Sequence, residues 1–203
     1  EERVSATFSI LGKMLAMEPP KRIESFDISN ISGTDIVASM VVFQDGKPRK
    51  SDYKRFKVEG LSNQDDYASM HQVVKRRFAH YKEADKGFAE APDLLLIDGG
   101  VAHARVAVEA LEQLNLKMNV FGMVKDDRHR TRALVTPEGQ EIAIDSNQAV
   151  FSFIGTIQEE THRFAITYHH ESHSRSARHS ALDEIPGVGP ARRQALLKHF
   201  KSV

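Results

Sequence analysis

The chain has 203 residues, in which 28 Lys and Arg side chains balance 28 Asp and Glu, with ten His and neither Cys nor Trp. Its length fits one large domain with a small appendage, and a hydrophobic content of 40% excludes a wholly disordered chain. The absence of Cys excludes disulfides, thiol nucleophiles and Cys-type metal sites, so any metal must be held by carboxylates and His. No apolar run approaches the ~20 residues that a membrane span needs, and we expect a soluble cytoplasmic protein.

The zero net charge argues at first sight against a polyanionic partner. However, residues 47–57 carry six basic side chains and one acidic one, and residues 162–203 carry seven and three. Residues 61–110 have the opposite balance, with six basic and eight acidic side chains. Neutrality is therefore a cancellation between segments, which leaves a nucleic-acid partner open.

The predicted elements begin with a helix within residues 1–20, which we interpret as a linker. Its apolar side chains recur at helical spacing, and Pro19-Pro20 ends it. Three strands follow, and Asp45-Gly46 between the second and third is the strongest hairpin signal in the chain. We expect an antiparallel arrangement of these strands, which cover residues 22–29, 35–43 and 53–58.

Helices and strands then alternate. A helical pattern begins at Asp65-Asp66, and the four apolar residues before Asp98 are typical of a strand buried on both faces. Gly99-Gly100 turns that strand into another helix. This order predicts an α/β fold in which a mixed sheet carries helices on its faces. A further strand, a hairpin and a helix are predicted at residues 118–124, 133–144 and 147–164.

The last part of the chain has a different composition. Residues 169–180 contain Ser, His and Arg with almost no apolar residue, which predicts a flexible linker. The four histidines in this segment match no standard metal-site spacing, so we assign no metal to them. Residues 181–203 form a small all-α unit, in which I-P-G-V-G-P at 185–190 is typical of the turn in a helix-hairpin-helix motif.

Glycines in such a turn allow backbone N–H groups to approach a DNA phosphate, and basic side chains on the second helix add charge contacts. The alternative is an ordinary helical hairpin. The DNA-binding candidates here are Gly187, Gly189, Arg192, Arg193 and Lys198.

Two carboxylates stand out within predicted strands. Asp27 lies inside the first strand, where an unpaired charge is costly, and Asp98 ends the strand before Gly99-Gly100. Ligands of open α/β sheets collect at the carboxyl ends of parallel strands. If the two strands are parallel neighbours, the carboxylates meet, and a divalent cation such as Mg²⁺ or Mn²⁺ resolves their repulsion. The alternatives are a salt-bridged strand residue for Asp27 and a turn residue for Asp98.

Two further residues are candidates for the same edge of the sheet. His162 follows on a helix after the last strand, and a packed or surface His is its alternative interpretation. Asp66 begins a helix, where capping explains it equally well. No glycine-rich nucleotide loop and no nucleophile elbow accompany these residues, which disfavours nucleotide-cofactor and serine-hydrolase chemistry.

Six motifs in order resemble the UvrC family, the incision subunits of the bacterial excinuclease ABC. The resemblance implies an RNase H-like endonuclease domain over residues 21–168, followed by helix-hairpin-helix motifs, that acts in nucleotide excision repair. The motifs are F-D-I-S-N at 26–30, V-A-S-M-V-V-F at 37–43, D-D-Y-A-S-M at 65–70, L-I-D-G-G at 96–100, E-E-T-H-R-F-A at 159–165 and I-P-G-V-G-P at 185–190.

The family cuts the damaged strand on the 5′ side of a lesion with an Asp-Asp-His metal triad. The resemblance implies Asp27, Asp98 and His162 as ligands of Mg²⁺ or Mn²⁺, with His162 completing the ligand set or orienting the attacking water. Asp66 corresponds to a further acidic residue that the family needs, and Lys125 to a Lys after the fifth strand. The implied partners are lesion-containing double-stranded DNA, UvrB through a docking segment outside these residues, and indirectly UvrA; no membrane is implied.

The chain departs from the family pattern at two places. Residues 101–103 read V-A-H where many relatives have K-G-Q, and a single helix-hairpin-helix stands where the family has two. We predict a metal-dependent DNA endonuclease, in which Lys125 is a DNA-binding residue. The basic segments 47–57 and 128–132, the second beginning with Arg128, are the candidates for guiding the DNA backbone; solvated surfaces are the alternative for both segments. The alternative functions are a catalytically inactive nuclease-fold DNA-binding module and a cofactor-binding α/β enzyme.

Overall fold

The computed structural model describes residues 2–31, 35–60, 65–183, 186–187 and 189–200, with the backbone alone at residues 31, 169–183, 193, 197 and 200. The chain divides into two compact units, Glu1–Ala165 and Ile166–Val203. Each unit is described by itself. No helix in these described ranges combines the length and the apolar character that crossing a bilayer requires.

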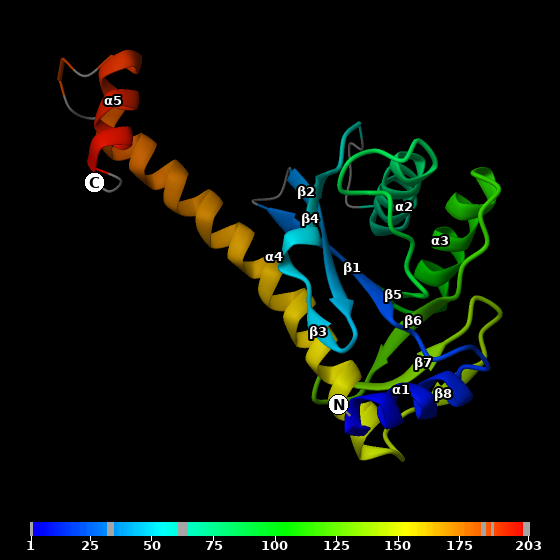
Figure 1. The fold of residues 1–203 in the computed structure, drawn as a ribbon. Coiled ribbons are helices and arrows are strands. Elements are labelled where there is room, and N and C mark those ends of the chain that lie inside the picture. Colours follow the sequence, from blue (N-terminus) through cyan, green and yellow to red (C-terminus); the bar gives the residue numbers. More distant parts are fainter. Residues whose placement is uncertain (1, 32–34, 61–64, 184–185, 188, 201–203) are drawn as a thin grey trace. The chain divides into compact units, whose positions relative to one another are not determined.

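The first unit is built on one mixed sheet of eight described strands, in the order β3-β2-β1-β5-β6-β7-β8, with β4 also paired to β2 (Figure 1). The predicted α/β class with a mixed sheet is confirmed. The strands are β1 (Arg22–Ile31), β2 (Asp35–Gln44), β3 (Lys47–Pro48), β4 (Lys54–Lys57), β5 (Leu94–Asp98), β6 (Val120–Lys125), β7 (Thr131–Val135) and β8 (Glu141–Ala143).

The centre of this sheet is parallel and its two sides are antiparallel. β5 pairs in parallel with β1 on one side and with β6 on the other. β2 and β4 extend the sheet in antiparallel fashion beyond β1, and β7 and β8 do so beyond β6. The expected parallel neighbourhood of the strands that carry Asp27 and Asp98 is therefore present, with Phe26 aligned to Ile97.

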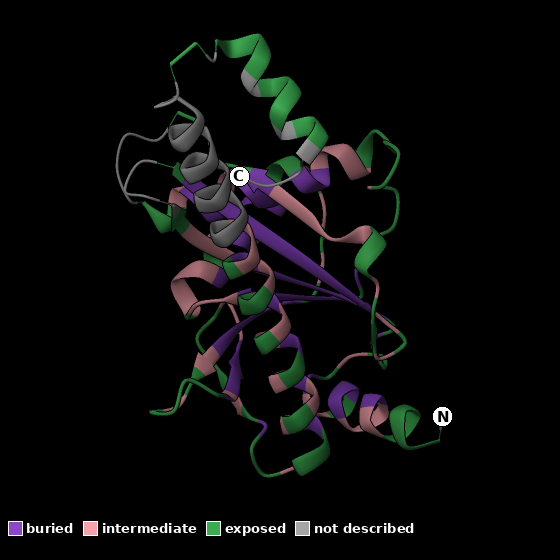
Figure 2. Ribbon diagram, turned by 90° about the vertical axis from the view of Figure 1, so that its left-hand side faces the viewer, coloured by how far each residue is buried: buried purple, intermediate pink, exposed green. Residues whose placement is uncertain are grey.

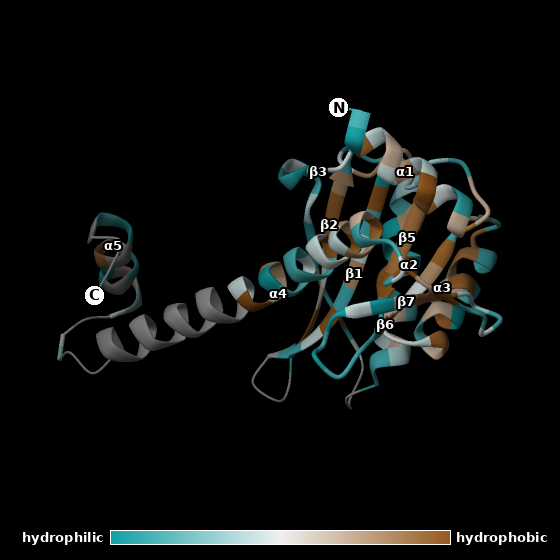
Figure 3. Cartoon of the chain, turned by 90° about the horizontal axis from the view of Figure 1, so that it is seen from below, coloured by the Kyte–Doolittle hydropathy of each residue, from teal (hydrophilic) through white to brown (hydrophobic). Residues whose placement is uncertain are grey.

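Helices cover both faces of the sheet, and side chains alternate between two hydrophobic cores. The helices α2 and α3 lie together on one face, where they pack on alternate strand residues such as Phe26 and Ile97 (Figure 1). α1 and the first part of α4 cover the other face over Ile23 and Leu96. Figure 2 shows the strands buried between these layers, and Figure 3 shows their apolar character. The helices are α1 (Glu2–Met14), α2 (Asp66–Lys82), α3 (Val101–Gln113) and α4 (Gln148–Asp183).

Two local features differ from the sequence prediction. Residues 169–180, expected as a flexible linker, continue α4 as regular helix. No Gly or Pro occurs between Gly155 and Pro186, so nothing in the backbone chemistry ends the helix there. In addition, the chain forms the short strand β3 and a 3₁₀ turn, Lys50–Asp52, between the second and third expected strands, where no element was predicted.

The second unit contains the end of α4 and the helix α5 (Pro190–Phe200). Gly187 adopts a left-handed conformation with φ of +84°, which suits Gly at a turn. Pro190 occupies the first position of α5, where its missing N–H costs no helical hydrogen bond. Arg192 donates from Nη1 to the carbonyl of Gly187 at 2.9 Å, so the guanidinium holds the turn before its own helix.

Candidate active site

Three charged residues lie close together where the parallel pairing of β1, β5 and β6 ends. Asp27 lies in β1, Asp98 is the last residue of β5, and Lys125 is the last residue of β6. Because side chains alternate along a strand, each of them lies on the face covered by α1 and α4. The carboxyl ends of parallel strands are where ligands of α/β sheets bind, which makes this edge the candidate site.

The charges in this cluster interact directly. Lys125 Nζ lies 2.7 Å from Asp98 Oδ1, and the Asp98 side chain is only 11% exposed. Asp27 and Asp98 each follow the aligned pair Phe26 and Ile97, so they stand side by side on neighbouring strands. One ammonium group therefore faces two carboxylates.

The Asp27 carboxyl is strongly perturbed by this environment. Burial, and then the negative charge of Asp98, raise the pKa of Asp27 to about 7, and Lys125 offsets only part of that increase. A second positive charge at this position would favour the ionised form of both carboxylates. Such a strongly raised pKa beside a specific charge partner is typical of functional sites.

Close backbone approach shapes the turn after Asp98. Gly122 in β6 lies under this turn, and a Cβ atom at Gly122 would come 2.6 Å from the carbonyl oxygen of Gly99. Gly99 itself has φ of +154° and pairs with Met123. These two glycines let β5 end against β6, which holds Asp98 at the edge next to Lys125.

Asp66 is the first residue of α2, and its side chain is exposed. The helix is capped instead by Asp65, whose carboxylate accepts from the N–H of Ala68 at 3.0 Å. Helix capping therefore does not account for Asp66, although a first-turn position favours any negative charge. Next to it, the ring of Tyr67 lies 4.6 Å from the ring of His103, whose side chain packs against Gly99.

His162 lies on α4 and is exposed. Its neighbour Thr161 points into the core and donates to Ser25 Oγ at 3.0 Å, two residues before Asp27. One turn earlier, Gln158 accepts from the N–H of Thr131, the residue aligned with Lys125. His162 is therefore on the flank of α4 that faces β7 and the end of β6.

The structure does not gather a third ligand beside the two carboxylates. Across the described ranges, no group of three His, Asp or Glu side chains is close enough to hold a metal ion. Asp27, Asp98 and Lys125 are thus brought together, whereas Asp66 and His162 lie on the helices around them. The role of His162 as a ligand stays a prediction.

The residues proposed for DNA contact lie in both units. Arg128 is in the exposed turn between β6 and β7, which Asp126 organises by accepting from the N–H groups of Arg128 and Arg130, both at 2.9 Å. In the second unit, Gly187 and Gly189 are exposed, Arg192 lies in the first turn of α5 and Lys198 in its last turn; the side chain of Arg193 lies outside the described residues.

The two central carboxylates fit a hard divalent cation. Mg²⁺ prefers oxygen ligands and commonly uses one or two carboxylates, with water and substrate phosphate completing its coordination. Asp27 and Asp98 supply that donor set without any soft ligand. Binding would require Lys125 to release Asp98 or to share it with the cation.

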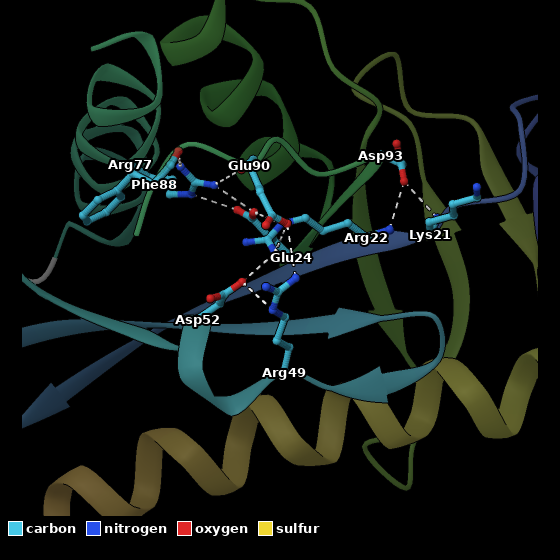
Figure 4. A network of polar contacts seen from close by, with 9 residues as sticks. All are labelled: Lys21, Arg22, Glu24, Arg49, Asp52, Arg77, Phe88, Glu90 and Asp93. Atoms are coloured by element: carbon cyan, nitrogen blue, oxygen red, sulfur yellow. Dashed lines mark hydrogen bonds and ion pairs between the residues drawn. The ribbon is translucent and has the colours of Figure 1, made fainter. Parts of the chain in front are cut away.

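Sequence reasoning missed a second charged cluster, near the start of β1 and on the face of the sheet covered by α2 and α3. Figure 4 shows the polar contacts of this cluster. Glu24 is completely buried and accepts from Arg77 of α2 at 2.9 and 3.0 Å, and from Arg22 at 3.0 Å. Asp52 and Glu90 bind the other side of Arg22. The sequence holds one indication of this cluster: Arg22 and Glu24 are two residues apart in a strand and therefore lie on the same face of the sheet. Glu24, Asp52 and Glu90 are each paired with a guanidinium, whereas the charged neighbours of Asp27 are Asp98 and Lys125.

Comparisons with known proteins give matches to one family of sequences. The sequence model of a protein family, described as the UvrC RNase H endonuclease domain, matches residues 12–166 of this chain. UvrABC system protein C from Clostridium novyi is 46% identical over an alignment that covers the whole of this chain and 35% of the relative. The protein of the same name from Clostridium acetobutylicum is 46% identical over 92% of this chain and 32% of the relative. The chain thus spans about a third of the curated relatives that it matches.

Among solved structures, endonuclease V of Ciona intestinalis in complex with DNA aligns with a TM-score of 0.40 at 15% identity, over 62% of this chain and 58% of that one. Human endonuclease V aligns with a TM-score of 0.38 at 16% identity, over 68% of this chain and 74% of that one. The domain model and the relatives cover the strands that carry Asp27, Asp98 and Lys125. The chain belongs to the UvrC family and contains its RNase H endonuclease domain.

Proposed function

We propose that this chain is a metal-dependent endonuclease that makes the 5′ incision beside a lesion in bacterial nucleotide excision repair. The observation that carries the proposal is the Asp27 and Asp98 pair at the carboxyl ends of two parallel strands, with a raised pKa at Asp27. Membership of the UvrC family supports the reaction class and the pathway.

Each residue of the edge has a distinct task in this proposal. Asp27 and Asp98 hold Mg²⁺ or Mn²⁺, which would lower the pKa of bound water and neutralise charge that develops on the scissile phosphate. Lys125 balances the charge of Asp98 and carries a positive charge toward the phosphate. His162 and Asp66 approach from the surrounding helices and orient the attacking water or contribute to a cation once DNA is bound.

The substrate and partners in this proposal are lesion-containing double-stranded DNA, UvrB and, indirectly, UvrA. The names of the relatives, UvrABC system protein C, support these partners. Arg128, the basic segment 47–57 and the glycine turn before α5 are the proposed contacts to the DNA backbone. We place the protein in the cytoplasm, where repair of bacterial DNA takes place.

Nicking of supercoiled plasmid DNA in Mn²⁺ tests the proposal. The wild-type chain should convert the plasmid to open circles. Asp27→Asn keeps the shape of the side chain but removes its charge, and should lower the rate by about a hundredfold or more, because even a group that only orients a metal ligand is worth about 10- to 100-fold. Glu112→Gln is the matched control: it removes the charge of an exposed carboxylate in the last turn of α3, at the opposite end of that helix from the turn after Asp98, and should leave nicking unchanged. Equal nicking by wild-type and Asp27→Asn protein would exclude the assigned site, and absence of nicking by both would favour an inactive DNA-binding module.

A further inference from the structure

One polar side chain lies in the core beside Asp27 without a partner. Ser39 in β2 is completely buried, and its Oγ atom has no hydrogen-bond partner among the residues that the structure describes. The register of β1 and β2 aligns Ser39 directly with Asp27. Aligned residues point to the same face of a sheet, with Cβ atoms about 5 Å apart. The Ser39 side chain therefore projects from the sheet next to that of Asp27, on the face that carries Asp98.

The remaining neighbours of Ser39 do not explain the hydroxyl. On the same face of β2, Val37 and Val41 are apolar and buried. Arg55 is aligned with Ser39 from the other side, but its guanidinium turns to α4, where it stacks 4.0 Å from the ring of Phe164 and donates to that residue's carbonyl. An unbonded buried hydroxyl costs free energy that Ala at the same position would not.

We propose that Ser39 is a positioning residue for Asp27: its hydroxyl donates a hydrogen bond to the ionised Asp27 carboxylate when that carboxylate binds a divalent cation. This inference rests on the proposed function. The Ser39 hydroxyl has one O–H to donate. A hydrogen bond to an ionised carboxylate is stronger than one to a neutral acceptor, which makes Asp27 the favoured partner. Hydrogen bonds of this kind fix the orientation of a ligating carboxylate and raise its affinity for the metal.

Binding of Mn²⁺ alone to the chain, followed by the electron paramagnetic resonance signal of the free ion, tests this role without any reaction. Ser39→Ala should weaken Mn²⁺ binding about tenfold, since loss of a group that orients a ligand typically costs 10- to 100-fold in affinity. Ser39→Cys keeps most of the volume but supplies only a weak donor, so it should bind Mn²⁺ nearly as weakly as the Ala variant.

Ser25 provides the matched control. It is also a completely buried serine on the same face, two residues before Asp27, but its Oγ already accepts from Thr161. Ser25→Ala should therefore leave Mn²⁺ affinity unchanged. Urea unfolding in EDTA gives a second readout, in which Ser39→Ala should be at least as stable as the wild type, because it removes a buried hydroxyl that bonds to nothing.

Wild-type Mn²⁺ affinity in Ser39→Ala, or a loss of stability in EDTA, would overturn the inference. The first result would mean that the hydroxyl does not act on the ligand, and the second that it has a structural partner. Asp27→Asn separates this failure from that of the proposed function. If Asp27→Asn binds Mn²⁺ as the wild type does, the metal site itself is wrong; if only Ser39→Ala does so, the site stands and the role of Ser39 is wrong.

Discussion

At the scale of single residues, Asp27 is a charge placed where the fold disfavours it. Its pKa is raised by burial and by Asp98, so the folded protein holds a proton there that the unfolded chain releases at a pKa of ~3.9. Folding stability therefore falls as the pH rises from about 4 to about 7, and the loss persists above that range. A residue kept at such a cost is expected to serve binding or catalysis instead of stability.

We predict that Asp27→Asn stabilises the protein at pH 8 by about 2 kcal/mol when EDTA is present, and has little effect near pH 4. Urea unfolding at several pH values measures this difference. Asp126→Asn should show the opposite sign at pH 8. Hydrogen bonds from the N–H groups of Arg130 and Arg128 lower the pKa of Asp126, so its contribution to stability is present above the ordinary pKa and is lost in acid. Destabilisation of Asp27→Asn at pH 8 would contradict the prediction and indicate a structural ion pair.

The sequence alone identified Asp27 and Asp98 as candidates, because Asp27 interrupts the apolar pattern of a strand and Asp98 ends an apolar strand just before Gly99-Gly100. It could not show that Lys125 contacts Asp98, since that ion pair depends on the order of β5 and β6 in the sheet. Ser39 also escaped notice, because a serine in a strand is unremarkable until its register partner is known.

At the scale of elements, the buried cluster around Glu24 joins β1 to α2. Glu24 and Arg77 are 0% and 1% exposed, so each depends on the other for its charge to be tolerated. Removing one member of a buried pair leaves an uncompensated charge in the core. The cluster therefore fixes how α2 packs on the sheet, and with it the position of Asp66 at the start of that helix.

We predict that Arg77→Met lowers the free energy of unfolding by about 3 kcal/mol, as measured by urea denaturation. Arg49→Met is the matched control. Arg49 belongs to the same cluster but is 42% exposed, so its loss should cost less than about 1 kcal/mol. Equal losses of stability in Arg77→Met and Arg49→Met would show that contact with the buried Glu24 does not determine how much each arginine contributes to the free energy of unfolding.

Elements with a continuous pattern were predictable to within a few residues, and those built by tertiary contacts were not. β3 and the 3₁₀ turn after it form because the N–H of Arg49 donates to the carbonyl of Val42 and Asp52 binds Arg22. Neither contact leaves a trace in local sequence. Conversely, the polar composition of residues 169–180 suggested a linker, although composition alone does not break a helix when Gly and Pro are absent.

At the scale of the whole molecule, zero net charge limits how strongly the chain can hold DNA. Basic residues of the segment 47–57 are partly engaged within the protein, as Arg49 is with Asp52 and Arg55 is with Phe164. These contacts reduce the number of cations in this segment that can displace counterions from a duplex. In the proposed function, targeting to a lesion then depends on the partner proteins.

We predict weak binding of the chain to a labelled duplex, with a slope of about −3 for the logarithm of the association constant against that of the salt concentration. Fluorescence anisotropy titrations at NaCl concentrations between about 25 and 200 mM measure this slope. Arg128→Ala should make the slope shallower by about one if that side chain contacts a phosphate. A slope of about −6 or steeper would show that many more cations reach the DNA than the charge balance suggests.

The parallel pairing of β1 with β5 also has a consequence for the order of events during synthesis. The partners Phe26 and Ile97 are 71 residues apart in the chain, so this contact requires closure of a long loop and forms late compared with the local β1–β2 hairpin. Asp27 alone, on a nascent hairpin, lacks the second carboxylate. Under the proposed function, a nascent chain that has not yet paired β1 with β5 would therefore lack the two adjacent carboxylates of the metal site.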